Sequence, residues 1–247
     1  MKIVAIGGGE IGRPGTKIET LEIDEEILRL SGKKNPKLLF IPTASGDSAG
    51  YIDVVETYFG IKLGCTVDTL LLWGTDLSER EIEKKIESAD IIYVGGGNTL
   101  SMIRLWKKLG VDTLLQNAAE RGVVLSGVSA GAVCWFRYAN SDSRKMVDPK
   151  ADYVRIRALD FLPLFVCPHF NAEKDRQESL KKMLKGSGQT AIGLDNCAAL
   201  VIEDDTFRIV TSKPKASAHL CYWKNNRYLK RVLKKGPYPL PELLKIP

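Results

Sequence analysis

The sequence predicts an α/β fold in three layers, with a mainly parallel β-sheet flanked by helices. Short apolar runs typical of strands alternate along the chain with amphipathic segments of roughly 10–15 residues that are typical of helices. Strands joined by helical crossovers run parallel, and a parallel sheet is covered on both faces. The chain has 247 residues, of which 44% are hydrophobic. That is enough for one core, so we expect a single domain over residues 1–247.

The individual elements follow from local patterns. The predicted strands are short apolar runs at residues 2–7, 37–42, 66–72, 90–94, 123–128, 164–168 and 191–194. The predicted helices carry apolar positions on one face and lie at residues 21–31, 50–63, 78–87, 98–109, 113–121, 130–138 and 173–185. Ser78 and Glu81 have the spacing of a capping box, which predicts where the third helix begins.

The pattern changes after residue 195. Residues 198–202, 207–211 and 219–223 form short alternating runs, and an acidic turn separates the first two. Such runs predict antiparallel strands that extend the same domain. The remaining tail contains prolines at positions 237, 239 and 241, and we expect it to cross the surface.

The net charge of +6 is confined to this tail. Residues 224–247 carry seven cations and one anion, so residues 1–223 have no net charge. Few aromatic residues accompany the basic extension, which argues against a nucleic-acid partner. We expect a solvated face or an oligomer contact, such as that of a homodimer.

Other classes of protein are excluded by composition. No apolar run approaches the roughly eighteen residues of a membrane span, and the apolar start is too short for a signal peptide. Five cysteines without a C-x-x-C pair predict reduced, mostly buried thiols in a cytoplasm. Only two histidines are present, which excludes a metal site built on several of them.

Residues 7–12, Gly-Gly-Gly-Glu-Ile-Gly, follow the first predicted strand and satisfy G-x-G-x-x-G. A dinucleotide site also needs a helix that begins there at once and an acid after the second strand. Arg13 and Pro14 instead continue the loop, and the second strand ends in Pro-Thr-Ala. We therefore expect no cofactor, and interpret the segment as a flexible loop at the carboxyl edge of the sheet.

A second glycine motif is more specific. Gly127-Val128-Ser129-Ala130-Gly131 lies between a predicted strand and a predicted helix, which is the setting of a nucleophile elbow. Side chains at positions 127 and 131 would collide with neighbouring backbone. The hydroxyl of Ser129 would stand at a helix N-terminus, where developing negative charge is favoured.

The glycine loop at residues 95–97 follows another predicted strand. It lacks the Lys-Ser/Thr pair of a phosphate loop. Beside an elbow, its backbone N–H groups suit an oxyanion hole. Gly96, Asn98 and Thr99 are the substrate-binding candidates in this loop.

A serine nucleophile needs a base, and His169 ends a predicted strand at the same edge. His219 lies in an alternating run and is interpreted as a strand residue. His169 is therefore the candidate base. The acid that would orient its ring stays open at this point among Asp142, Asp148, Asp152 and Asp195.

Four motifs together resemble one family, that of peptidase E (aspartyl dipeptidase) and cyanophycinase. They occur at residues 40–45, 94–99, 127–132 and 168–170, in matching order. The resemblance covers about residues 1–212. It implies a serine peptidase on a flavodoxin-like, class I glutamine-amidotransferase-like fold.

The resemblance also implies roles for single residues. Ser129 matches the nucleophile, His169 matches the base, and Gly97 and Ala130 match the oxyanion-hole positions. Because the family acid precedes a Val-Asp-Pro sequence, present here at residues 147–149, the acid role passes to Asp142. Asp148 is the alternative and Asp195 a poorer match.

The sequence thus predicts a cofactor-free and metal-free serine peptidase of dipeptides or short peptides, Asp-X dipeptides among them. Residues 9–19 and 135–148 depart from the aspartyl dipeptidase and are candidates for contributing to specificity. Two alternatives remain. One is an amidotransferase-like amide hydrolase that uses Cys134, and the other is a non-catalytic homologue that binds a small ligand.

Overall fold

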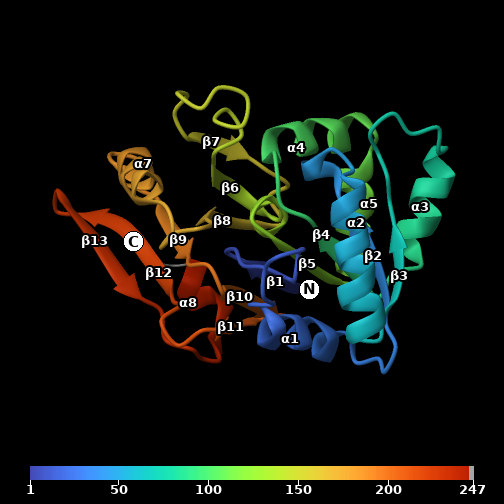
Figure 1. The fold of residues 1–247 in the computed structure, drawn as a ribbon. Coiled ribbons are helices and arrows are strands. Elements are labelled where there is room, and N and C mark those ends of the chain that lie inside the picture. Colours follow the sequence, from blue (N-terminus) through green and yellow to red (C-terminus); the bar gives the residue numbers. More distant parts are fainter. Residues whose placement is uncertain (245–247) are drawn as a thin grey trace.

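The computed structural model describes residues 1–244, apart from the side chain of Lys174. Within that range the strands form two mixed sheets, and helices pack around both of them (Figure 1). The predicted α/β fold class is confirmed. The strands differ from the prediction in that they divide between two sheets.

The first sheet carries the parallel strands. Its order is β14-β11-β10-β1-β5-β4-β2-β3. The strands are β1 (Lys2–Ile6), β2 (Lys37–Ile41), β3 (Thr66–Thr69), β4 (Ile91–Val94), β5 (Val124–Val128), β10 (Ala198–Glu203), β11 (Thr206–Thr211) and β14 (Tyr238–Pro239). The first five run parallel, whereas β10 pairs antiparallel with β1, and β11 and β14 continue that antiparallel edge. The carboxyl ends of β1, β5 and β4 therefore meet at one edge.

The second sheet brings a later part of the chain to the same edge. Its order is β13-β12-β9-β8-β6-β7. The strands are β6 (Phe136–Ser141), β7 (Val154–Arg157), β8 (Leu162–Cys167), β9 (Thr190–Leu194), β12 (Ala218–Lys224) and β13 (Arg227–Val232). β8 runs parallel to both β6 and β9. Its end leads directly into the backbone contact between the His169 N–H and the Gly7 carbonyl, 2.9 Å apart, which joins the two sheets.

Helices cover the sheets on both sides. α1 (Leu21–Ser31), α2 (Ala49–Val55) and the π-helical segment η2 (Glu56–Lys62) pack on one face of the first sheet. α3 (Glu79–Glu87), α4 (Thr99–Lys108), α5 (Val111–Glu120) and α6 (Ala130–Val133) form the core on its other face. α7 (Lys174–Leu184) packs on the second sheet, and α8 (Leu240–Leu244) closes the C-terminal part. The Ser78–Glu81 capping box is present at the start of α3.

Two predicted segments fold differently. The helix expected at residues 130–138 ends after α6, because Trp135 and Phe136 are fully buried and the chain turns there into strand β6. The basic extension lies at the surface, as predicted, but it forms regular elements there. Within its described residues it pairs as β13 with β12, and it buries Leu240 and Leu243 on α8. Residues 245–247 of that extension lie outside the described residues.

Several side chains bear on the chemical environment. All five cysteines are buried and unpaired, as predicted. Asp24 on α1 is also fully buried. Its carboxylate accepts hydrogen bonds from Thr20 Oγ1 at 2.7 Å and from Tyr58 at 2.8 Å, and burial raises its pKa to about 7. Among residues 1–244, no helix combines the length and the apolarity that a bilayer crossing requires.

Candidate active site

Ser129 occupies a strained turn directly after β5. Its backbone has φ 56° and ψ −108°, a conformation that side-chain-bearing residues adopt only where the surroundings impose it. The turn depends on its glycines, as predicted. A Cβ at position 127 would lie 2.5 Å from the Val94 carbonyl oxygen, and one at Gly131 would lie 2.0 Å from the same atom.

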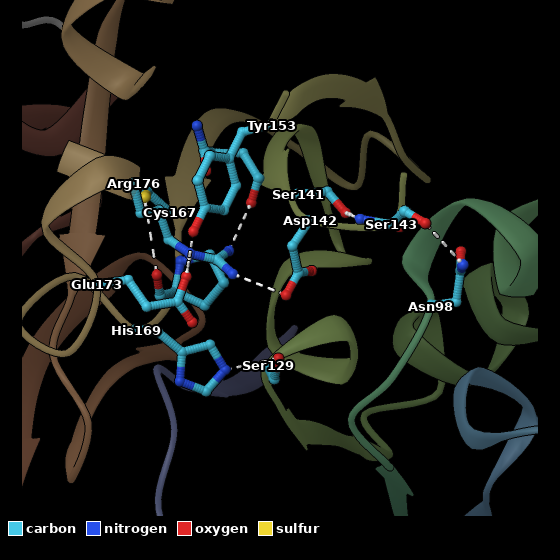
Figure 2. A network of polar contacts seen from close by, with 12 residues as sticks. Asn98, Ser129, Ser141, Asp142, Ser143, Tyr153, Cys167, His169, Glu173 and Arg176 are labelled. Atoms are coloured by element: carbon cyan, nitrogen blue, oxygen red, sulfur yellow. Dashed lines mark hydrogen bonds and ion pairs between the residues drawn. The ribbon is translucent and has the colours of Figure 1, made fainter. Parts of the chain in front are cut away.

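His169 faces the serine from the end of β8. Its Nε2 lies 2.8 Å from Ser129 Oγ (Figure 2). His169 also has a positive φ, 51°, and its backbone N–H donates to the Gly7 carbonyl. Burial lowers the pKa of the imidazole below its ordinary value. The ring is therefore neutral at pH 7, with Nε2 placed to accept the serine proton.

The other nitrogen of the ring meets an amide rather than a carboxylate. His169 Nδ1 lies 2.7 Å from Asn196 Oδ1. An amide oxygen only accepts, so Nδ1 carries the proton and donates it, which leaves Nε2 free as a base. The backbone N–H of Asn196 donates in turn to Asn171 Oδ1 at 2.9 Å. The orienting group is thus Asn196, which follows β9.

The glycine loop after β1 shapes this pair. A Cβ at Gly8 would lie 2.1 Å from Asn196 Oδ1 and 2.5 Å from His169 Nδ1. The carbonyl of Gly8 also accepts from the Cys197 N–H at 2.8 Å. Gly7 and Gly8 therefore support the imidazole, and the segment lies at the carboxyl edge of the sheet, where it was predicted.

The predicted acid lies elsewhere. Asp142 forms an ion pair with the buried Arg176, 3.0 Å away, and does not contact Nδ1 (Figure 2). Asp195 instead accepts from the Ser217 N–H, with His219 Nε2 at 3.3 Å. Asp148 accepts from the backbone of Lys150, and Asp152 is exposed. A buried guanidinium requires a carboxylate partner, which explains the placement of Asp142.

Asn196 could have been found from the sequence. It follows a predicted strand at the same edge as His169, by the logic that selected the histidine. A neutral acceptor fixes the tautomer of an imidazole as an acid does, so the position of Asn196 after a strand is the signal that points to it.

Backbone amides beside Ser129 are available for an oxyanion. Within residues 1–244, neither the Gly97 N–H nor the Ala130 N–H donates a hydrogen bond. Gly97 has φ 140°, and a Cβ there would lie 2.1 Å from the Ala44 carbonyl oxygen, so only glycine fits. The N–H of Gly96 is directed to the Tyr51 hydroxyl at 3.4 Å.

The predicted substrate-binding residues separate into two groups. Gly96 lines the cavity at Ser129. Asn98 caps α4 by accepting from the Ser101 N–H, and its amide donates to the Ser143 carbonyl at 3.0 Å (Figure 2). Thr99 is buried in the core. Asn98 and Thr99 therefore hold the loop in place and do not line the cavity.

The cavity itself measures about 550 Å³, which suits a small ligand. Its walls are formed by the loop after β1, by α2 and by the ends of the strands that lead to Ser129 and His169. The lining residues are Gly9, Glu10, Ile11, Arg13, Pro14, Glu19, Ser45, Ser48, Gly50, Tyr51, Val54, Tyr93, Gly96, Val128, Ser129, His169 and Asn196. Over the described residues, no three His, Cys, Asp or Glu side chains gather to hold a metal ion.

A charged cluster flanks the serine and the histidine on the side of the second sheet (Figure 2). Arg176 is 1% exposed and lies between Asp142 and Glu173, with its Nε 2.9 Å from Glu173 Oε2. Tyr153 donates its hydroxyl proton to Glu173, and the guanidinium stacks on its ring. The cluster ties the loop after β6 to the start of α7.

Comparisons with known proteins agree with this geometry. Residues 3–210 match the family described as Peptidase family S51. The uncharacterised peptidase YgaJ of Bacillus subtilis (strain 168) is 36% identical over 223 residues, which cover 88% of this chain and 90% of YgaJ. Peptidase E of Salmonella heidelberg is 30% identical over 118 residues, which cover 44% of this chain and 50% of that protein.

The fold is also found in a solved structure. The crystal structure of a peptidase from an acI-B1 actinobacterium superposes with a TM-score of 0.63 at 18% identity, over 95% of this chain and 94% of that one. The likeness in fold therefore extends beyond the residues that match the family. The match over residues 3–210 shows that this chain belongs to peptidase family S51.

Proposed function

We propose that this protein is a serine peptidase that hydrolyses dipeptides or short peptides, with Ser129 as nucleophile, His169 as base and Asn196 as the orienting residue. The observation that carries the proposal is the 2.8 Å contact between Ser129 Oγ and His169 Nε2 on a strained strand-to-helix turn. The cavity of about 550 Å³ supports a short substrate.

The reaction follows from the positions of the protons. Ser129 Oγ attacks the peptide carbonyl while His169 Nε2 accepts its proton, and the Gly97 and Ala130 amides stabilise the oxyanion. The imidazolium then gives the proton to the leaving amine, and the C–N bond breaks to leave an acyl-enzyme. A water molecule then attacks the acyl-enzyme in the same way, with His169 as base, and releases the acyl part of the peptide as a carboxylic acid. Asn196 keeps the Nδ1 proton in place throughout.

Cys134 does not support the amidotransferase alternative. It is fully buried, its thiol donates to the Gly131 carbonyl at 3.3 Å, and burial raises its pKa well above the ordinary value. A thiol held in that state is not a nucleophile.

A fluorophosphonate probe and a panel of dipeptides that includes Asp-X test the proposal. We expect wild type to be labelled at Ser129 and to hydrolyse some of the panel. Ser129→Ala should lose both properties, and Ser88→Ala, a control in an exposed serine at the end of α3, should keep them. Equal turnover by wild type and Ser129→Ala would refute the role of Ser129. An unlabelled, folded and inactive wild type would favour a non-catalytic homologue.

A further inference from the structure

The loop at residues 10–19 places charges on the wall of the active-site cavity. It closes on itself through a bridge between Ile11 and Ile18, and the N–H of Glu10 donates to Glu19 Oε2 at 3.3 Å. Glu10, Arg13 and Glu19 all line the cavity that contains Ser129. This segment therefore sets the electrostatic environment that a substrate meets.

The only cation in that lining is already paired. Arg13 Nε donates to Glu10 Oε2 at 2.7 Å, and a second nitrogen of Arg13 contacts the other oxygen of the same carboxylate. This hydrogen bonding lowers the pKa of Glu10, so the pair is fully ionised near pH 7. The two N–H···O contacts use both oxygens of the Glu10 carboxylate. Within residues 1–244, the lining therefore holds no cation that is free of a carboxylate partner.

Glu19, by contrast, has no ion-pair partner among the described side chains. Beyond the cavity, Asp142 and Glu173 share Arg176, and Lys145 lies over the Tyr153 ring of the same cluster. The excess of negative charge thus lies in the cavity lining, where Glu10 and Glu19 face the single cation Arg13. A positively charged group of a substrate is therefore stabilised in the cavity, and a negatively charged group is destabilised there.

The cavity also offers an uncharged compartment. Ile11, Val54 and Val128 contribute apolar surface to its walls. Tyr93, which is fully buried, lines the same cavity, and its hydroxyl has no hydrogen-bond partner within residues 1–244. Burial raises the pKa of Tyr51 to about 12 and that of Tyr93 further, so both hydroxyls stay protonated. An unpartnered buried hydroxyl needs an acceptor, which a ligand or a water can supply.

We infer that Glu19 binds the α-ammonium group of a peptide whose first side chain is uncharged, and that the cavity disfavours an N-terminal aspartate. The inference rests on the proposed function, because it names the substrate class of the Ser129 centre. The N-terminal residue of the peptide then places its ammonium group against the loop at residues 10–19. Its side chain lies among the apolar walls near Tyr93, and its carbonyl lies at Ser129.

The test compares matched substrates with matched variants. The substrates are Leu-Ala, Asp-Ala, and 4-methylpentanoyl-Ala, which is Leu-Ala with hydrogen in place of the ammonium group. The variants are Glu19→Gln and the control Glu22→Gln, which removes an exposed carboxylate three residues away that does not line the cavity. Labelling of Ser129 by a fluorophosphonate is measured in parallel for each protein.

We expect wild type and Glu22→Gln to favour Leu-Ala over both other substrates by about tenfold or more in kcat/KM, as for loss of one charged hydrogen bond. In Glu19→Gln the ratio of Leu-Ala to its desamino analogue should fall towards one. An unchanged ratio in that variant, or Asp-Ala as the best substrate of wild type, would overturn the inference. Absence of labelling and turnover in wild type would instead overturn the proposed function.

Discussion

The neutral group behind His169 leads to a test in which a charge is added. Replacing Asn196 by aspartate would put a carboxylate oxygen where the amide oxygen lies, 2.7 Å from Nδ1. An opposite charge at such a distance favours the protonated imidazole and raises its pKa by about 1 to 3 pH units. In wild type that pKa is held below its ordinary value by burial.

The sign of the effect on activity follows from the role of the base. Only neutral His169 can accept the serine proton, so kcat/KM is lost as the pH falls through the pKa of the free enzyme's histidine. Wild type should therefore keep activity well into the acidic range. Asn196→Asp should lose its activity at a pH about 1 to 3 units higher.

The assay is the pH profile of kcat/KM on one dipeptide, measured for wild type, Asn196→Asp and the control Asn171→Asp. The control adds the same charge at the residue that accepts the Asn196 N–H, one contact further from the ring. In the control, the pH at which activity is lost on the acidic side of the profile should shift less than in Asn196→Asp. An acidic limb that stays in place or moves to lower pH in Asn196→Asp would refute the assigned contact.

Three further predictions concern other parts of the molecule. Gly8→Ala should lower kcat by about a hundredfold, because the new methyl group displaces the imidazole, and an unchanged kcat in a folded protein would contradict the packing. Asp142→Asn should still be labelled at Ser129 by a fluorophosphonate, and its free energy of unfolding should fall by about 1–3 kcal/mol as Arg176 loses one partner, measured by urea denaturation. Asp24 keeps its proton in the folded state up to about pH 7, whereas the ordinary pKa of an aspartate is 3.8. Wild type should therefore lose stability as the pH rises from 3.8 to about 7. The slope should be at most about 1.4 kcal/mol per pH unit, and urea midpoints that fall equally in Asp24→Asn would contradict this origin.

Much of the site could be predicted because its requirements are local. The elbow at Ser129 needs small residues on both sides of a turn, and that need is visible in five consecutive positions. His169 could be predicted because the chain has so few histidines and because parallel strands end at one edge.

The remainder depends on contacts between distant segments. The partner of His169 lies 27 residues further along the chain, and the packing of the segments decides which polar residue at that edge faces the ring. The requirement for glycine at position 8 arises from the side chains of His169 and Asn196, which reach it only in the folded protein. Strand β6 forms because two large aromatic residues enter the core, and tertiary packing there outweighs the helical pattern.

The support of the imidazole by the loop after β1 also bears on the order of folding. β1 pairs with β5 on one side and with β10 on the other, and the carbonyls of Gly7 and Gly8 bind the backbone of His169 and Cys197. During synthesis, β1 can therefore gain its last neighbour only after residues near position 200 have been translated. Ser129 and His169 are both translated earlier, but the orienting contact forms only with that final closure. The geometry of the candidate site thus depends on the pairing of β1 with β10, two strands that lie almost two hundred residues apart.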